Sequence, residues 1–218
     1  MIRTVFLAAA AVFVTAAMVP VMTANAAPAV QKGKGAKVLW NQNSDSNGGF
    51  IVSQNFTSGT YTVDDDQGAD DFVVPKGKTW TVTEVDVTGQ YFGGSGVPAK
   101  SENVFFYKNK AAMGLPGGLV AHGAFKNLPG KDKSGSFSIS LGKQGLKLAA
   151  GTYWVSVVAN CNDTGGCGEW AWETRDPIIG SAAVWQQSNS EVCPTWGTLA
   201  DCFADTGDFM FDVRGKSK

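Results

Sequence analysis

The stretch Tyr153-Trp154-Val155-Ser156-Val157-Val158 carries apolar side chains at both even and odd positions. Successive side chains of a β-strand point to opposite faces of the sheet, so apolar residues in both phases indicate a strand covered on both sides. The stretch Val104-Phe105-Phe106-Tyr107 has the same character. These two stretches therefore predict the central strands of a buried sheet.

Further short segments with strand character surround these two, and Gly, Pro, Asn and Asp fill the gaps between them. Outside the first 26 residues, no window keeps a helical period for more than about two turns. Short strands at this spacing predict an all-β fold, an antiparallel two-sheet β-sandwich of jelly-roll-like form. The predicted strands cover residues 38–41, 50–56, 71–74, 79–88, 103–108, 119–125, 136–141, 151–159, 169–174, 182–187 and 209–214.

Strand phase also indicates which side chains face the core. In Glu169-Trp170-Ala171-Trp172-Glu173 the two Trp share one face and the two Glu share the other, so we expect the Trp side chains inside and the Glu side chains in solvent. In residues 209–214 the apolar positions alternate with Met210, Asp212 and Arg214, which we expect on a wetter face.

One strand does not keep its phase. The apolar positions of residues 80–87 slip by one residue between Val82 and Val85. An extra residue in the strand restores a single apolar face, so we expect a β-bulge near Thr83 or Glu84.

The charge and the histidine content of the chain narrow the classes of function that we expect. The chain has 218 residues, of which only 17% are charged, and its formal net charge is -1. Overall charge therefore provides no strong basic field, and we expect no nucleic-acid partner. The chain has a single histidine, His122, which narrows the catalytic options.

The N-terminus resembles an export signal. Arg3 precedes an apolar, Ala-rich run from Val5 to Met22, which ends at the small residues Ala24-Asn25-Ala26. An uncleaved membrane anchor is the alternative, because about 18 apolar residues nearly span a bilayer. We expect a signal peptide at 1–26, a flexible lead-in at 27–36, one β-sandwich domain at 37–215 and a tail at 216–218. The product would be secreted, to the periplasm or the extracellular medium, with no membrane association after cleavage.

Four cysteines agree with export. Cys161 and Cys167 bracket a short Gly-rich loop, and Cys193 and Cys202 bracket another loop. An even number of cysteines in an exported chain is typical of disulfides, and the two local pairings are favoured over the other two arrangements. A metal site is the alternative, but neither spacing is that of paired C-x-x-C motifs.

The order of several motifs resembles a loosely defined group of exported bacterial β-sandwich domains, mostly of unknown function. The resemblance spans about residues 38 to 215. The resemblance implies a fold but does not indicate any enzymatic activity, because its motifs consist of turns and core aromatic residues. It supplies no catalytic residue. The motifs that carry it are Asp70-Asp71-Phe72, Val104-Phe105-Phe106-Tyr107, Gly114-Leu115-Pro116-Gly117, Gly151-Thr152-Tyr153-Trp154-Val155-Ser156-Val157, Trp170-Ala171-Trp172 and Ala183-Val184-Trp185.

An acidic run gives a candidate metal site. Asp64, Asp66 and Asp70 surround a glycine turn, and carboxylates that converge in this way suit Ca²⁺. The run lacks the closing Glu of an EF-hand, and a solvated acidic turn between strands is the alternative. We expect no other cofactor.

Two further candidates concern catalysis and binding. Glu84 and Asp86 share one strand face, as the carboxylate pair of a glycosidase would, although a solvent-facing polar stripe is the far commoner explanation for such a pair. Trp196 lies in the loop between Cys193 and Cys202, where it is either an exposed plate that stacks on a sugar or a lid on the sandwich edge.

Together these features predict a secreted, non-catalytic recognition module that binds a glycan or a cell-surface protein. A secreted carboxylate-dependent hydrolase and a structural or adhesive matrix protein are the alternatives. The oligomeric state is left open.

Overall fold

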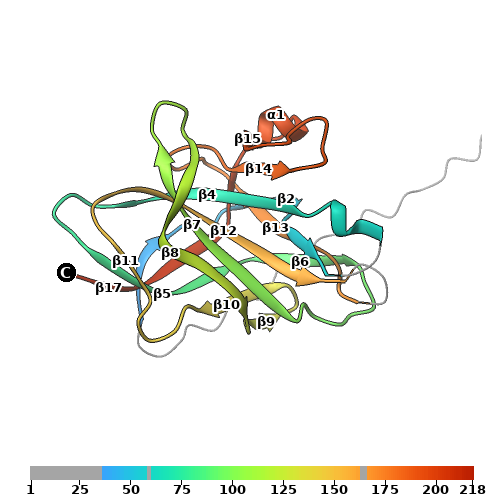
Figure 1. Cartoon of the computed structure of the whole chain (residues 1–218), viewed down its shortest axis with the longest axis horizontal. Coiled ribbons are helices and arrows are strands. Elements are labelled where there is room, and N and C mark those ends of the chain that lie inside the picture. The colour runs from blue at the N-terminus through green and yellow to red at the C-terminus, as the bar shows by residue number, and fades with distance from the viewer. Residues whose placement is uncertain (1–35, 58–59, 163–165) are drawn as a thin grey trace, which may run out of the picture.

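The structure, a computed structural model, describes residues 36–57, 60–162 and 166–218. The predicted signal peptide and nearly all of the lead-in lie outside the described residues. Three sheets of mainly antiparallel strands form an all-β sandwich, as the sequence predicts (Figure 1). Within the described residues, the structure contains no helix with the length and apolar character needed to cross a bilayer.

Sheet A has the strand order β1-β17-β5-β10-β9, with β11 beside β5. Its strands are β1 (Lys37–Asn41), β5 (Trp80–Val87), β9 (Lys131–Lys133), β10 (Ser136–Ser140), β11 (Leu146–Leu148) and β17 (Phe211–Ser217). β17 runs past the predicted domain end at Gly215, because Lys216 and Ser217 pair with Thr81 and Trp80.

Sheet B has the order β16-β13-β2, with β6 also paired to β13. Its strands are β2 (Ser46–Val52), β6 (Gly89–Gly93), β13 (Gly168–Arg175) and β16 (Asp208–Phe209). Backbone hydrogen bonds join it to sheet A, since Thr88 donates to Met210, Met210 donates to Glu173 and Glu173 donates to Thr88. Sheets A and B therefore continue into one another.

Sheet C has the order β15-β14-β4-β12-β7-β8, with β3 parallel to β12. Its strands are β3 (Gln54–Phe56), β4 (Asp66–Val74), β7 (Ser101–Lys110), β8 (Leu115–Leu128), β12 (Gly151–Cys161), β14 (Val184–Gln187) and β15 (Gly197–Thr198). β7 and β12 each lie between two other strands, which confirms the two central strands that the sequence predicts. Among the described residues, two short helices complete the fold, η1 (Thr60–Val63) and α1 (Leu199–Phe203).

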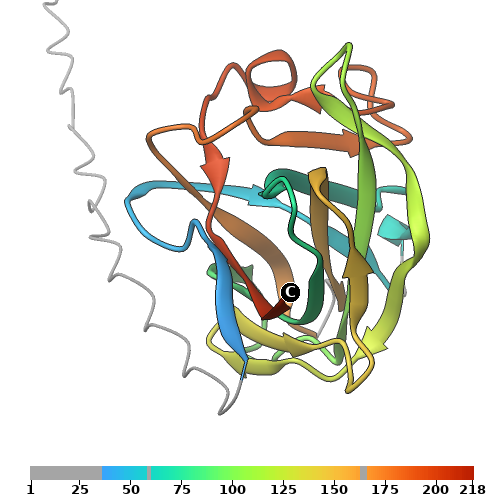
Figure 2. The same ribbon diagram turned by 90° about the vertical axis from the view of Figure 1, so that its left-hand side faces the viewer.

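One apolar core lies between sheet C and the joined sheets A and B. Figure 2 shows the strands of these sheets end-on. Trp172 stacks on Phe209 with ring centroids 4.6 Å apart, and Trp170 contacts Phe137 at 5.0 Å. Phe72 of sheet C lies parallel to Trp80 of sheet A, with centroids 6.2 Å apart. The inward orientation predicted for Trp170 and Trp172 is confirmed, because both are fully buried.

The predicted β-bulge is confirmed at Thr83. Arg214 of β17 pairs with Glu84 and Gly215 pairs with Val82, so Thr83 has no partner in that ladder. The extra residue changes the phase of β5, and Val82 and Val85 both point into the core as a result.

The polar faces of two strands are less exposed to solvent than the sequence predicts. Glu173 is only 6% exposed, and Ser46 Oγ donates a hydrogen bond to its carboxylate. Met210, Asp212 and Arg214 are also buried. The prediction of solvent exposure was wrong at these positions, because partners from other strands cover them.

Candidate functional site: a groove lined by amides on sheet C

The outer face of sheet C changes character along β12. Val155, Val157 and Ala159 point into the core, so Trp154, Ser156, Val158 and Asn160 point outward. Trp154 is buried with Ala69 and Val184 under an apolar cap formed by Tyr107, Leu115 and Trp196. Asn160 lies at the polar end of the strand.

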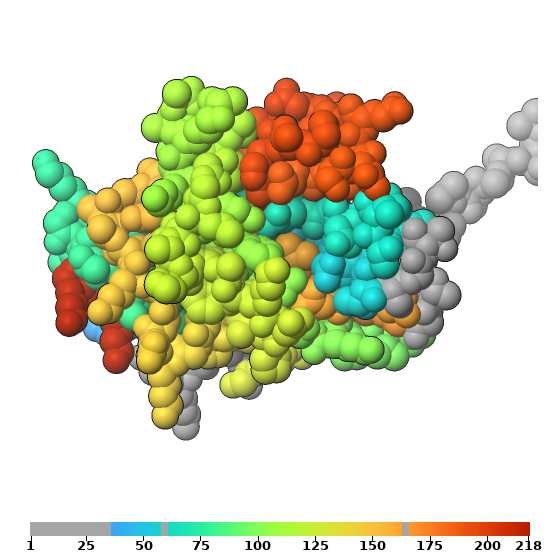
Figure 3. Space-filling model, in the orientation of Figure 1, coloured from blue at the N-terminus to red at the C-terminus, as the bar shows by residue number. Residues whose placement is uncertain are grey.

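At that polar end the face is hollowed into a groove of about 470 Å³. β7 and β12 contribute Phe105 and Val158, β8 contributes Lys126, and the segment after β14 contributes Pro194. Figure 3 looks onto this face, with the 184–203 segment above the ends of β4 and β12. Seven residues with amide side chains belong to the lining: Gln54, Asn55, Gln67, Asn103, Asn127, Asn160 and Gln186. The amide of Gln54 is fully buried and bonded to the backbones of Gly168 and Trp170, so the other six are the candidates for contact with a ligand.

Asn160 organises the amides of four strands. Asn55 Nδ2 and Asn103 Nδ2 each donate to Asn160 Oδ1 at 2.8 Å. Asn160 Nδ2 donates to Ser101 Oγ at 2.9 Å and to Asn103 Oδ1 at 3.1 Å. The backbone N–H of Asn127 donates to Asn103 Oδ1 at 2.9 Å. The network fixes the positions of these side chains before any ligand arrives.

A second chain of hydrogen bonds supports the other side of the groove. Gln67 Nε2 donates to Tyr107 Oη at 2.8 Å and to Ser156 Oγ at 2.9 Å. Gln186 Nε2 donates to Gln67 Oε1 at 3.0 Å. β14 is thereby joined to the floor of the groove through side chains as well as through its backbone.

Two carboxylates enter the lining from the start of β4. Asp65 Oδ1 accepts from the backbone N–H of Phe56 at 2.8 Å, and Asp66 Oδ1 accepts from that of Gln54 at 2.7 Å. Burial raises the pKa of Asp66 well above its ordinary value. Each carboxylate thus holds β3 against β4 with one oxygen.

The positions of the candidate calcium ligands along β4 keep them apart. Asp66 and Asp70 both lie on β4, and Asp70 is fully buried in the interior. Asp70 Oδ2 accepts from Gln42 Nε2 at 2.7 Å and from the backbone N–H of Phe209 at 2.6 Å. Among the described residues, no group of three or more His, Cys, Asp or Glu side chains is arranged to hold a metal ion. Calcium binding stays a prediction, which melting curves with calcium and with a chelator would test.

The candidate catalytic carboxylates lie on the opposite sheet from the groove. Arg214 Nε donates to Asp86 Oδ2 and lies 3.8 Å from Glu84 Oε1. Arg214 Nη2 also contacts Asp212 Oδ2 at 3.1 Å. Burial, together with neighbouring Asp86, raises the pKa of Glu84. In this structure both carboxylates are partners of one buried guanidinium.

Trp196 packs back onto the sandwich. Its ring meets that of Tyr107 edge to face, with centroids 5.7 Å apart, and it contacts the cluster of Ala69, Trp154 and Val184. The side chain is half-buried, as a lid would be.

Both disulfides have the predicted local pairing. Cys161 is bonded to Cys167, and Cys193 is bonded to Cys202. Thr198 caps α1, which carries Cys202, by accepting a hydrogen bond from the backbone of Asp201. The loop that carries Trp196 is therefore closed at both ends.

The comparisons with known proteins identify no family. No protein-family profile matches the chain, and no curated protein matches it. A solved structure of the cysteine protease and lectin-like domains of Cwp84, a surface layer associated protein of Clostridium difficile, aligns with a TM-score of 0.45 and 13% identity. The alignment covers 70% of this chain and 32% of the other, so this chain spans about a third of that structure.

The groove amides were not among the site residues predicted from the sequence. Asn55, Asn103, Asn127 and Asn160 come from four strands and meet only through the sheet register. A signal was present, because Asn is depleted in strands and Asn103 and Asn160 stand inside segments predicted or observed as strands.

Proposed function

We propose that the protein is an exported, non-catalytic recognition module that binds a glycan in the amide-lined groove of sheet C. The observation that carries the proposal is the groove itself, which gathers six amides, besides the buried Gln54, around a partly exposed aromatic ring. Amides both donate and accept hydrogen bonds, as the hydroxyl groups of a sugar do. The volume of about 470 Å³ is in the range of small-ligand sites.

Phe105 supplies the apolar contact that a sugar ring requires. It lies on the outer face of β7, half-buried, with its ring 6.4 Å from that of Tyr107. Aromatic rings bury a large area at low conformational cost, so the C–H face of a pyranose can lie against this ring while its hydroxyl groups reach the amides.

The hydrogen-bond network reduces the cost of binding. Asn160 and Asn103 are 4% and 8% exposed and already hold one another in place. Side chains that are ordered before binding lose less entropy when a ligand arrives. This feature favours a binding site for a polar ligand over a merely structural surface.

Export is part of the proposal. The two local disulfides are typical of an oxidising compartment, and the apolar run before Ala26 has the form of a signal peptide.

A glycan array followed by calorimetry on the best ligand tests the proposal. Phe105→Ala and Gln186→Ala should each weaken binding by at least about tenfold, because each removes one kind of contact from the groove. Phe92→Ala is the matched control, since Phe92 is a partly exposed aromatic residue outside the groove, and it should leave the affinity unchanged.

Two outcomes would overturn the proposal. Binding that survives both groove substitutions would place the glycan elsewhere. Release of reducing sugar from the bound glycan, abolished by Glu84→Gln or Asp86→Asn, would make the protein a hydrolase.

A further inference from the structure

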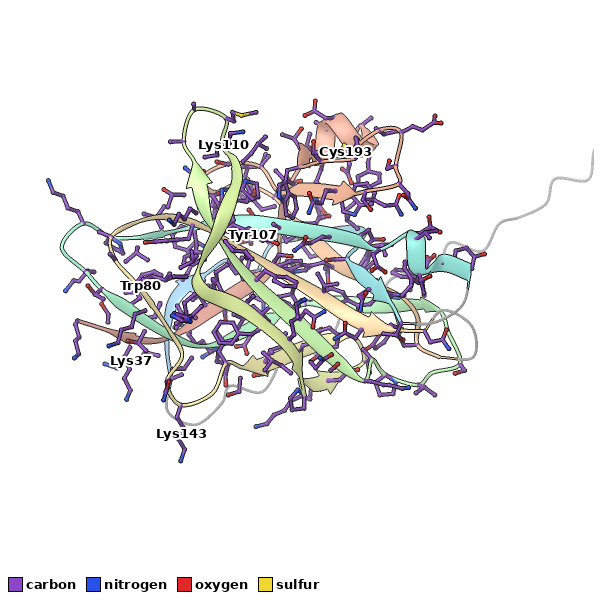
Figure 4. The ribbon with its side chains drawn as sticks, viewed as in Figure 1. Lys37, Trp80, Tyr107, Lys110, Lys143 and Cys193 are labelled. Atoms are coloured by element: carbon purple, nitrogen blue, oxygen red, sulfur yellow. A yellow bond between two sulfur atoms is a disulfide. The ribbon has the colours of Figure 1, made fainter. Side chains whose placement is uncertain are left out.

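The positive charges of the protein are unevenly distributed over its surface. Nine of the thirteen described lysines lie on or beside sheet A, and all nine are exposed. One is on β1, two are in the turn before β5, two are on β9, one follows β10, one is on β11, and Lys216 and Lys218 end the chain. Figure 4 shows Lys37 and Lys143 at the lower left of the view, whereas Lys110 lies at the top.

The charge balance of the two parts has opposite sign. Sheet A and its turns carry ten basic side chains, counting Arg214, against four acidic ones, whereas the other described residues carry five basic and fourteen acidic ones. The near-zero net charge of the chain therefore hides a basic surface on sheet A. We use the name basic surface for the nine lysines and the sheet A face between them.

The acidic groups of sheet A are engaged with partners. Glu84, Asp86 and Asp212 surround the guanidinium of Arg214. Asp132 accepts from Tyr91 Oη at 2.7 Å. The exposed lysines, by contrast, extend from strand edges and turns, where a ligand can approach them.

A groove of about 600 Å³ crosses this surface. Lys131, Lys143 and Lys216 line it, together with Thr83, Ser138 and Ser140. One carboxylate, that of Glu84, also belongs to the lining and lies 3.8 Å from Arg214 Nε. Thr83 is the bulged residue of β5, so the bulge is part of the groove wall.

We propose that the basic surface binds a linear polysaccharide that carries carboxylate or sulfate groups. Lysine ammonium groups are compact point charges, and their spread over several strands suits the spaced charges of a polymer better than a single small anion. The hydroxyl groups of the groove lining can bond to the hydroxyl groups of a sugar backbone.

The residues that line this groove do not suit two other kinds of polyanion, single-stranded nucleic acids and anionic membranes. Single-stranded nucleic acids are held by stacking on aromatic side chains, and the described lining of this groove contains none. Anionic membranes are held by a basic face together with inserted apolar side chains, and the lining offers only Ala36 and Pro129.

The site is independent of the amide-lined groove. The two lie on opposite layers, one on sheet A and the other on sheet C, and Figure 2 views the sheet A end with β17 beside β1. A protein with both sites would link an anionic polymer to a second glycan.

The test is binding of the purified protein to dextran, carboxymethyl dextran and dextran sulfate, three polymers with the same backbone and different charge. We expect binding to at least one charged polymer and none to dextran. Because exposed charges are screened by salt, the affinity should fall by at least about tenfold between about 0.05 and 0.3 M salt. The carboxylate and sulfate polymers distinguish which anionic group is preferred.

Charge reversal locates the site. The triple variant Lys131→Glu, Lys143→Glu, Lys216→Glu should lose at least about tenfold in affinity. The control variant Lys100→Glu, Lys108→Glu, Lys110→Glu makes the same change in net charge away from sheet A and should lose less than about threefold. Circular dichroism verifies that both variants fold.

Three results would overturn the proposal. Equal loss in the two triple variants would indicate attraction by net charge alone. Failure of both charged dextrans to bind would remove the site. Tighter binding to oligo(dT) or to phosphatidylglycerol vesicles than to the charged dextrans would assign the surface to a nucleic acid or a membrane.

Discussion

Asn103 and Asn160 exchange two side-chain hydrogen bonds across β7 and β12, at 2.8 and 3.1 Å. Each amide donates to the oxygen of the other, so neither can rotate without breaking both bonds. Asn160 also donates to Ser101 and accepts from Asn55. The pair therefore supports the floor of the groove in which we place the glycan.

We predict that Asn160→Asp destabilises the protein by about 1–3 kcal/mol. The substitution keeps the shape but removes the donor that serves Ser101 and Asn103, and it places a carboxylate against a carbonyl oxygen in a buried site. Thermal or urea unfolding near neutral pH measures the effect.

Asn109→Asp is the control for this change. Asn109 Oδ1 accepts from Trp154 Nε1 at 3.0 Å, and a carboxylate accepts that bond equally well. We expect a change below about 0.5 kcal/mol. Equal stability of the two variants would show that the Asn160 network does not contribute.

Stability should fall as pH rises from about 5 to 8, partly through Glu102. Burial raises the pKa of this carboxyl from its ordinary value of 4.5 to about 7, and nearby Asp132 acts in the same direction. Between these two values the folded protein keeps a proton that the unfolded chain has released, so folding is favoured at low pH and this advantage is lost as pH rises. Asp71, with a pKa raised to about 6 by burial, adds to the same trend.

Glu102→Gln isolates the contribution of this residue. The amide oxygen can still accept the hydrogen bond from the backbone N–H of Gly130, which lies 2.6 Å from the carboxylate. We expect the variant to be more stable than the wild type at pH 8, by up to about 3 kcal/mol, and nearly equal to it at pH 4. Urea unfolding across this pH range measures both, and parallel pH profiles would contradict the assignment.

Arg214→Ala should be among the most damaging substitutions, at about 3–5 kcal/mol. Arg214 is 3% exposed and contacts Glu84, Asp86 and Asp212, so its removal leaves a buried cluster of like charges. Lys100→Ala, on the surface, is the control and should change stability by less than about 0.5 kcal/mol. If acidic pH, which neutralises the carboxylates, fails to restore part of the lost stability, electrostatics is not the cause.

The core could be predicted from the sequence and the site could not, for a physical reason. The core depends on a local pattern, since residues two apart on a strand share a face. The pattern predicted the inward Trp170 and Trp172 and a bulge near Thr83 or Glu84, which the structure has at Thr83. The groove depends on register between distant strands, which brings Asn55 and Asn160 together although they are 105 positions apart.

The distribution of charge over the surface likewise could not be predicted from the sequence. The formal net charge of -1 indicated no basic field, because a sum over the chain ignores position. Folding places the lysines around sheet A and most carboxylates elsewhere. Burial of Arg214 and Glu173 also depends on partners from other strands, such as Asp86 and Ser46, that no local pattern reveals.

Trp196→Ala decides between the two roles of this residue. Because its ring packs on Tyr107 and on the cluster around Trp154, we expect a loss of about 2 kcal/mol, roughly half the cost of removing a fully buried Trp. Glycan affinity should change by less than about threefold, since the ring contacts the cap rather than Phe105. Trp196→Phe, which keeps an aromatic ring against Tyr107, should recover most of the stability. Unfolding and calorimetry on the same preparations measure both quantities, and an unchanged melting temperature with lost affinity would make Trp196 part of the binding surface instead of a lid.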